Sequence, residues 1–279
     1  MFNTADIDRL IEEDVPYFDL TSYVLGIGEV KAEVVFRSRG ETVICGTEEC
    51  RAVFNSLGIE TDRFIPSGTV VKGGEEIISG VGNGEAIHKA WKVCQNLLEY
   101  ASGIATRTKR LVDLAKRVNP KAVVVTTRKT FPLAKKVCIK GILCGGALPH
   151  RLGLSETVLI FKNHYKLLGG FENLVKKLDE IKQRVPEKKI VVEAENPDEA
   201  RILIDSGVDV VQLDKFSVGD VKEVVKYRDG RAPHVKVAVA GGLNEKNIEE
   251  YASTGAEIFV LTSAYFGKPA DIGVEIRRC

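Results

Sequence analysis

The second half of the chain repeats one pattern, in which a short apolar run precedes an amphipathic helical segment. Such runs suit parallel strands covered on both faces, and repeated strand–helix units form a parallel α/β barrel or an open doubly wound sheet. The clearest runs are AVVV (122–125), TVLIF (157–161), IVVEA (190–194), VDVVQL (208–213), VKVAVA (235–240) and AEIFVL (256–261). GILC (141–144) is a candidate for a seventh strand. Six or seven units fall short of the usual eight, so we predict a barrel with an incomplete wall.

The first hundred residues differ, because short β-like runs there lie among glycines. Apolar pairs at 70–71 and 77–78 flank a Gly-Gly pair, which predicts hairpins. Apolar residues then recur every three and four positions between about residues 85 and 101, which predicts a helix with one buried face. These features indicate a small open α/β sandwich ahead of the barrel.

The predicted fold class is therefore α/β, with an N-terminal open sandwich and a C-terminal, incomplete, six- or seven-stranded parallel α/β barrel. The repeated strand–helix pattern begins near residue 105, and we place the domain boundary there. We predict a sandwich domain over residues 1–104 and a barrel domain over 105–264, with the tail 265–279 rejoining the sandwich.

Composition and charge exclude several kinds of protein. The 279 residues carry 40 basic and 39 acidic side chains, a net charge of +1, so the chain lacks the basic field of a nucleic-acid binder. No apolar run reaches the roughly 20 residues that cross a bilayer, and the start of the chain lacks a signal-peptide core. Six cysteines form no CxxC pair and are predicted to be buried free thiols. We expect a soluble, cytoplasmic protein that binds small molecules and neither nucleic acid nor membrane.

Polar or small residues follow nearly every predicted strand of the second half. In parallel α/β folds the carboxyl ends of the strands meet at one rim, and that rim holds the active site. We therefore expect these side chains to lie near one another. In chain order they are Arg128 and Lys129, His150 and Arg151, Lys162, Glu193, Asp214, Gly241 and Gly242, and Thr262 and Ser263.

The predicted rim divides into three chemical parts. The first four residues of that series make a cationic part, which Lys162 can extend. Glu193 and Asp214 make an acidic part, able to accept hydrogen bonds from sugar hydroxyls or to meet a divalent metal. The glycine pair and the Thr-Ser pair end the last two strands, where backbone N–H groups can approach a phosphate. A phosphorylated ribose that carries a diphosphate fits all three parts.

Each part also has a simpler interpretation. Arg128 and Lys129 can be a solvated strand end, and a glycine pair after a strand is commonly just a turn. Glu193 can merely pair with a neighbouring cation. His150 and His164 can be structural. The joint pattern favours a site, because the simpler interpretation must explain polar clusters at nearly every strand end.

Several motifs together resemble one known family. They are SGIATRT (102–108), TTRKTFP (126–132), GGALPHRLGLSE (145–156), the spacing of Glu193 and Asp214, and GGLNEKNIEEYASTGAE (241–257). In this order they are similar to the quinolinate phosphoribosyltransferases (nicotinate-nucleotide pyrophosphorylases), the type II phosphoribosyltransferases. Within that family they resemble the ModD branch, which is found with molybdate transport genes. The motifs do not specify a substrate.

The resemblance implies an activity and an assembly. Quinolinate enzymes of this family join a diacid to 5-phosphoribosyl 1-diphosphate with Mg²⁺, a step of NAD biosynthesis that yields nicotinate mononucleotide, diphosphate and CO₂. The family also implies an open sandwich, an incomplete barrel, and a homodimer or higher homo-oligomer. In that assembly each active site is completed by the sandwich domain of the partner subunit.

The resemblance also implies roles for the rim residues. Arg128, His150 and Arg151 fall where the family holds the acceptor acid, and Lys129 falls near the diphosphate and the reacting carbon. The ribose, metal and phosphate positions fall on Glu193 and Asp214, on Gly241 and Gly242, and on Thr262 and Ser263 nearby.

Three departures from the family pattern leave the acceptor open. An arginine that the family gives to the partner's site is Lys92 here, and a bidentate arginine is not equivalent to a lysine. The family's LIKDNH is LIFKNH here, so Phe161 replaces a lysine and Lys162 is displaced by one position, which on a strand turns it to the opposite face. Ala240 replaces a serine. The phosphoribosyl half is largely kept and the acceptor half is altered.

Two other functions stay open on sequence grounds. A barrel lyase or aldolase could use Lys129 or Lys215 as a Schiff base. A non-catalytic protein could bind a nucleotide or an oxyanion such as molybdate. Both explain fewer of the rim residues than phosphoribosyl transfer does.

Overall fold

The computed structural model describes residues 2–279, which form two compact units. The first unit comprises the chain up to Lys109 with Thr130–Gly146 and Ala264–Cys279, and the second comprises Arg110–Lys129 and Ala147–Ser263. Helix α4 (Gly84–Val118) runs without a break through the boundary predicted at residue 104. The predicted domain boundary therefore falls inside a helix, and the division into two domains stays a prediction.

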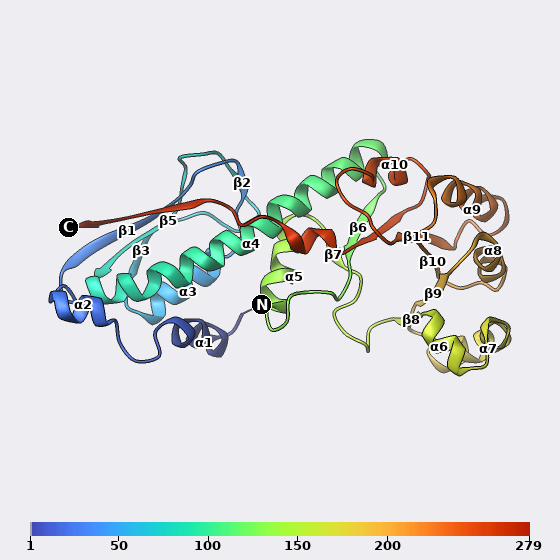
Figure 1. Cartoon of the computed structure of the whole chain (residues 1–279), viewed down its shortest axis with the longest axis horizontal. Coiled ribbons are helices and arrows are strands. Elements are labelled where there is room, and N and C mark those ends of the chain that lie inside the picture. The colour runs from blue at the N-terminus through green and yellow to red at the C-terminus, as the bar shows by residue number, and fades with distance from the viewer. Residues whose placement is uncertain (1) are drawn as a thin grey trace. The chain divides into compact units, whose positions relative to one another are not determined.

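An antiparallel sheet of order β13-β1-β5-β3 is the frame of the first unit (Figure 1). Its strands are β1 (Lys31–Ser38), β3 (Glu60–Phe64), β5 (Glu76–Asn83) and β13 (Ile272–Arg278). The last strand of the chain pairs with the first, with Val34 opposite Ile276. Helices α1 (Thr4–Asp14), α3 (Thr47–Ser56) and α4 lie along one face of this sheet (Figure 1).

The core of the first unit lies between this sheet and its helices. Fully buried residues of α4 include Ile87, Cys94 and Leu98, so the predicted apolar face of this helix is confirmed. They pack in one cluster with Phe36 of β1 and Phe54 of α3, whose ring centroids are 6.3 Å apart. All six cysteines are free thiols; four are buried, one is half-buried and one is exposed.

The hairpin predicted around Gly73 and Gly74 is wrong. Strand β4 (Val70–Val71) pairs with β2 (Thr42–Val43), whereas β5 pairs with β1 and β3. The Gly74 N–H donates to the Ser38 carbonyl at 2.7 Å, so the turn is bonded to the end of β1. The turn therefore passes the chain from a two-stranded ribbon to the main sheet.

Seven parallel strands form the second unit, in the order β7-β6-β12-β11-β10-β9-β8. The two edge strands, β7 and β8, do not pair with each other, so the barrel wall is incomplete and the predicted fold class is confirmed. The strands are β6 (Val123–Thr126), β7 (Leu148–Pro149), β8 (Val158–Ile160), β9 (Ile190–Ala194), β10 (Val210–Asp214), β11 (Lys236–Ala240) and β12 (Ile258–Leu261). The helices are α6 (Lys162–Leu167), α7 (Phe171–Arg184), α8 (Pro197–Asp205), α9 (Val218–Arg231) and α10 (Ile248–Ala252).

The seventh strand lies at Leu148–Pro149, so the candidate GILC is wrong. Residues 141–144 end helix α5 (Lys135–Cys144), which belongs to the first unit. Its buried residues Cys138, Ile139 and Ile142 recur at helical spacing. Gly141 permits close packing, since a Cβ there would lie 2.7 Å from the Ile104 side chain of α4.

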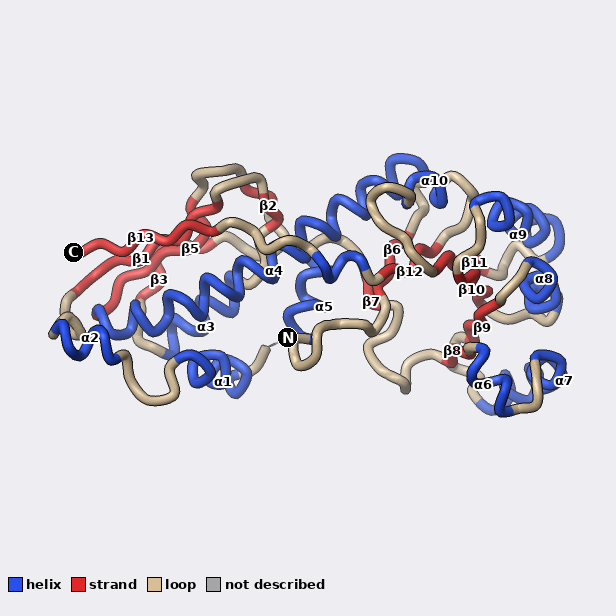
Figure 2. The backbone as a smooth tube through the Cα atoms, viewed as in Figure 1, coloured by secondary structure: helices blue, strands red, loops and turns tan. Residues whose placement is uncertain are grey.

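One face of the parallel sheet carries small apolar residues. Val125, Ala238, Ala240 and Val260 form a buried cluster on this inner face. Strand register places Asp214 opposite Ala240 on the same face. Helices α8 and α9 run along the other side of β9 and β10 (Figure 2). Within residues 2–279, no helix is long and apolar enough to cross a membrane.

Candidate active site at the rim of the parallel sheet

Sheet order arranges the predicted site residues along the rim by chemical type. The residues after β7 and β6 are basic, those after β12 and β11 are small, and β10 and β9 carry acids near their ends. Chain order does not give this grading, because β12 lies between β6 and β11 in the sheet. All the predicted rim residues from Arg128 to Ser263 belong to the second unit.

The end of β6 is tied to the end of β12 beside it. The Thr127 hydroxyl lies 2.8 Å from the Thr262 hydroxyl, and the Thr127 N–H donates to the Leu261 carbonyl at 3.0 Å. The Lys129 N–H in turn donates to Thr127 Oγ1 at 3.3 Å. The Thr127 hydroxyl thus helps to build the turn, while the side chains of Arg128 and Lys129 are exposed.

Three cationic side chains at this end of the rim form no close ion pair. Among the described residues, Arg128, Lys129 and Arg151 form no ion pair within 4.0 Å, and Arg151 is only 9% exposed. Burial and the Arg128 charge lower the pKa of Arg151, and the Glu156 charge opposes this. Burial and the Arg151 charge lower the pKa of His150, which favours the neutral imidazole. Unpaired, mutually repelling cations of this kind favour binding of an anionic ligand.

The glycine pair after β11 forms an open turn. Gly241 has a φ of +93° and Gly242 a φ of +76°. The side chains of Asn244 and Asn247 donate to the Gly242 carbonyl at 2.9 and 3.2 Å, which fixes the turn. No hydrogen bond from the N–H of Gly241 or Gly242 is found in the described part of the chain. Successive free N–H groups in such a turn can bind a phosphate oxygen.

Two carboxylates lie on the inner face near the ends of β9 and β10. Gln212 Nε2 donates to Glu193 Oε2 at 2.8 Å, and Asp214 lies two residues further along β10. Burial raises the pKa of Glu193; the hydrogen bond from Gln212 opposes this, and the Asp214 charge adds to it. The acids are close enough to interact and both point toward the rim's inner face.

These acids fit a divalent metal that is shared with a ligand. Within residues 2–279, no group of three or more His, Cys, Asp or Glu side chains could hold a metal ion alone. Mg²⁺ is commonly bound through one or two carboxylates plus substrate phosphates, and Glu193 with Asp214 supplies that number. Enzymes that transfer phosphoribosyl groups generally use a divalent metal.

The residues after β8 do not extend the cationic part of the rim. Phe161 keeps an extended backbone, so continuing the β8–β9 register places it opposite Glu193. Lys162 Nζ is bound by the Glu195 carboxylate, at 2.7 and 2.5 Å. His164 Nδ1 accepts from the Phe161 N–H at 2.9 Å, at the start of α6. An aromatic ring, without a free lysine, therefore flanks this end of the rim.

Lys92 lies outside this rim, on α4 in the first unit. Its side chain is exposed, with Nζ 2.9 Å from Gln95 Oε1 and 4.6 Å from the centre of the Trp91 ring. Its predicted place in the site of a partner subunit stays a prediction.

Sequence reasoning missed Gln212, which is 4% exposed and bonds Glu193. The signal was available, because a glutamine in the apolar run VDVVQL alternates with Asp214 on the inner face. Asn244 and Asn247, which hold the glycine turn, were also missed; their spacing is that of a turn leading into a helix.

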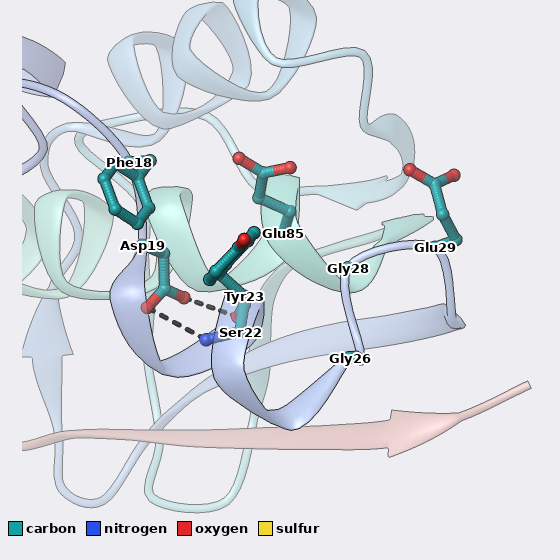
Figure 3. Close-up of a pocket in the computed structure, with 8 residues that line it drawn as sticks. All are labelled: Phe18, Asp19, Ser22, Tyr23, Gly26, Gly28, Glu29 and Glu85. Carbon is teal, nitrogen blue, oxygen red and sulfur yellow. Dashed lines mark hydrogen bonds between the residues drawn. The ribbon is translucent and has the colours of Figure 1, made fainter.

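A second feature lies in the first unit, around helix α2 (Leu20–Leu25). Its exposed apolar side chains, with exposed fractions of 55% to 89%, are Tyr17, Phe18, Leu20, Tyr23, Val24 and Leu25. Beside them a cavity of about 580 Å³ is lined by Phe18, Tyr23, Glu29 and Glu85 among others (Figure 3). Asp19 accepts hydrogen bonds from the N–H groups of Thr21 and Ser22, which begins the helix. Contiguous exposed apolar residues of this kind mark an interaction surface.

Solved structures share this architecture over the whole chain. The nicotinate-nucleotide pyrophosphorylase of Francisella tularensis superposes with a TM-score of 0.89 at 27% identity, covering 99% of this chain and 98% of that one. The corresponding enzyme of Ehrlichia chaffeensis has a TM-score of 0.90 at 23% identity, with 99% of each chain covered, and this likeness shows the fold alone.

Sequence relatives cover the chain equally fully. A ModD pyrophosphorylase of Pasteurella multocida is 34% identical over 277 residues, 99% of this chain and 98% of the relative. A nicotinate-nucleotide pyrophosphorylase (carboxylating) of Methanothermobacter thermautotrophicus is 31% identical over 278 residues, covering 97% and 98%.

Two family models match almost the whole chain between them. The N-terminal domain of quinolinate phosphoribosyl transferase matches residues 19–102, and its C-terminal domain matches residues 104–275. The resemblance predicted from the motifs is confirmed, and with it phosphoribosyl transfer as the reaction of the group. The chain belongs to the quinolinate phosphoribosyltransferase family.

Proposed function

We propose that this enzyme transfers the 5-phosphoribosyl group of phosphoribosyl diphosphate to a ring nitrogen of a carboxylated aromatic acceptor. The observation that carries the proposal is the grading along the rim. Unpaired cations stand at one end, a turn with free N–H groups in the middle, and two carboxylates beyond it. A diphosphate, a 5′-phosphate and a ribose match these three parts in charge and in hydrogen-bonding character.

Each part has a separate task in the reaction. Lys129 and Arg151 stabilise charge on the departing diphosphate, and the free N–H groups of Gly241 and Gly242 bind the 5′-phosphate. Glu193 and Asp214 hold the ribose hydroxyls while the bond to diphosphate breaks at the anomeric carbon. Mg²⁺, held through these acids and the ligand, would neutralise diphosphate charge. The acceptor nitrogen then attacks, so no protein nucleophile is required.

The acceptor is proposed to be a flat ring that carries a carboxylate. Arg128 and Arg151 supply cations for the carboxylate, and neutral His150 supplies a hydrogen-bonding edge. Phe161 supplies an apolar wall, and Lys162 is occupied by Glu195. Relatives named as carboxylating pyrophosphorylases make quinolinate the first acceptor to test. The loss of one free cation favours acceptors with a single carboxylate.

We further propose that two copies of the chain share their active sites, with Lys92 reaching the partner's acceptor. The exposed apolar side chains around α2 support this, because neighbouring exposed apolar residues of this kind commonly mark a protein–protein contact. A two-fold dimer would bury it against a second copy.

An acceptor screen with diphosphate release as the readout tests the proposal. The screen contains quinolinate, nicotinate and other carboxylated heterocycles, each with phosphoribosyl diphosphate and Mg²⁺. We expect release that depends on at least one of these acceptors, and a raised melting temperature with phosphoribosyl diphosphate and Mg²⁺ alone. Stabilisation by molybdate instead, with no release, would support an oxyanion binder. A borohydride-trapped adduct on Lys129 or Lys215 would support a lyase.

A further inference from the structure

Gln212 is a buried amide in the middle of strand β10, between apolar residues. It is 4% exposed, and the strand register places it between Glu193 of β9 and Ala238 of β11. Its Nε2 donates to Glu193 Oε2 at 2.8 Å, which joins the two strands below the rim. The adjacent Ala238 is fully buried and belongs to the apolar inner cluster.

The orientation of this amide is set by the carboxylate. Only the NH₂ group of glutamine can donate to a carboxylate oxygen, so the carbonyl oxygen must face away from Glu193. That oxygen, Oε1, is buried and has no hydrogen-bond partner among the described residues. A buried acceptor without a partner destabilises the folded chain.

An apolar residue at this position would remove the unpaired carbonyl oxygen. Methionine is unbranched and similar in length, so it fits with little change of packing. The contribution that methionine cannot make is the hydrogen bond to Glu193. That carboxylate lies on the inner face at the rim, where the proposed function places the ribose.

We propose that Gln212 is a positioning residue, which fixes the Glu193 carboxylate in the direction needed to bind the ribose of phosphoribosyl diphosphate. The inference rests on the proposed function. Gln212 does not touch the reacting atoms, since it lies one step down β10 from Asp214 on the same face. Its effect passes through Glu193 alone, as second-layer hydrogen bonds commonly orient a binding carboxylate.

Calorimetric titration of phosphoribosyl diphosphate with Mg²⁺ tests this without knowledge of the acceptor. The proteins are wild type, Gln212→Met, Glu193→Gln and the double variant. Gln183→Met, on the exposed surface of α7, controls for the substitution itself. We expect Gln212→Met to weaken binding about tenfold, the worth of one charge-assisted hydrogen bond. The Gln183→Met protein should bind as the wild type does.

The double variant separates positioning from general packing. If Gln212 acts through Glu193, adding Gln212→Met to Glu193→Gln weakens binding no further. Equal losses in both backgrounds would overturn the proposal. The melting temperature of ligand-free Gln212→Met gives a second readout, and we expect it within about 3 °C of wild type. A large fall in melting temperature with unchanged affinity would assign Gln212 a structural role instead.

The same titration distinguishes this inference from the proposed function. A wild-type protein that does not bind phosphoribosyl diphosphate would overturn the proposed function. A wild type that binds, beside a Gln212→Met protein that binds equally well, would overturn only the role of Gln212.

Discussion

At the scale of single residues, the turn after β11 is built around the contact of Gly241 with the end of β10. Lys215 is one of two described non-glycine residues with positive φ, at +61°, and its N–H donates to the Ala240 carbonyl at 2.8 Å. A Cβ on Gly241 would lie 2.8 Å from the Lys215 nitrogen and 2.9 Å from Asp214 Oδ1. The absence of a side chain at Gly241 therefore lets a proposed phosphate turn touch a proposed ribose acid.

Replacement of each glycine by alanine tests this packing. Gly241→Ala should lower the free energy of unfolding by about 3 kcal/mol, because strain from its positive φ adds to a clash with backbone. Gly242→Ala is the matched control, since it has positive φ but no neighbour within 4 Å, and should cost about 1 kcal/mol. Urea denaturation of the ligand-free proteins measures both. Equal losses would show that the contact with β10 contributes nothing.

Lys129 carries the largest predicted effect on turnover. Lys129→Ala should reduce diphosphate release about 10²–10³-fold, as the loss of one preorganised donor does, while the protein folds normally. Lys121→Ala, at the opposite end of the same strand, is the control and should keep wild-type turnover. Near-wild-type turnover in Lys129→Ala would remove this lysine from the diphosphate site.

At the scale of elements, helices α3 and α5 are joined by a cluster of charges in the first unit. Lys140 of α5 binds the carboxylates of Glu48, at 2.7 Å, and of Glu49, both in the first turn of α3. Burial tends to raise the pKa of Glu48, but hydrogen bonds from Lys140 and Ser67 outweigh it and lower this pKa to about 2. The carboxylate therefore stabilises the fold only while it is ionised.

Acid denaturation tests this cluster. Glu48 has a folded-state pKa below its usual 4.5, so its contribution is complete above that value and is lost as the pH falls toward 2. Glu48→Gln should cost about 1 kcal/mol at pH 7, since a side chain 39% exposed is screened by solvent, and the cost should shrink below pH 4.5. Urea midpoints of both proteins across this range measure it. A cost that does not change with pH would contradict the assignment, and exposed Glu187→Gln should show none.

Most elements of the second unit could be predicted, because strands buried on both faces leave near-continuous apolar runs. The predicted runs at 190–194 and 235–240 match β9 and β11 to within a residue. Strand β7 could not be found in this way, because its two residues, Leu148 and Pro149, are too few to give a pattern. The apolar GILC just before them is the end of a helix. The place of β7 was marked only by the polar residues that follow it.

Most residues of the candidate site could be predicted from the sequence, because they follow the ends of the apolar runs. Their order along the rim, from cations to acids, could not be predicted, because it depends on the order of strands in the sheet. The pairing of Lys162 with Glu195 depends on a side-chain contact between α6 and the residue that follows β9, which no spacing reveals. Gln212 was missed although it alternates with Asp214, because a single polar residue leaves the apolar run recognisable as a strand.

At the largest scale, the proposed dimer would complete each active site with residues from both chains. The rim residues belong to the second unit, whereas Lys92 and the exposed apolar side chains around α2 belong to the first. A dimer that exchanges these contributions would explain why so much apolar surface is exposed in a single chain.

Mixing two inactive variants tests the sharing of sites. We expect Lys92→Ala and Lys129→Ala each to lose acceptor-dependent turnover. Randomly mixed subunits should recover roughly a quarter of wild-type activity, because half the dimers are mixed and one of their two sites is intact. Recovery should require unfolding and refolding of the two proteins together. No recovery, with mixed dimers confirmed by native mass spectrometry, would place Lys92 outside the partner's site.

Phosphoribosyl transfer is tested most directly by its product, measured by mass spectrometry together with diphosphate. The protein is incubated with phosphoribosyl diphosphate, Mg²⁺ and each carboxylated aromatic acceptor. We expect one phosphoribosylated acceptor for each diphosphate released, with CO₂ lost in addition if a dicarboxylate such as quinolinate is used. Phosphoribosyl diphosphate that binds but yields no phosphoribosylated product with any carboxylated aromatic acceptor would contradict the proposed function.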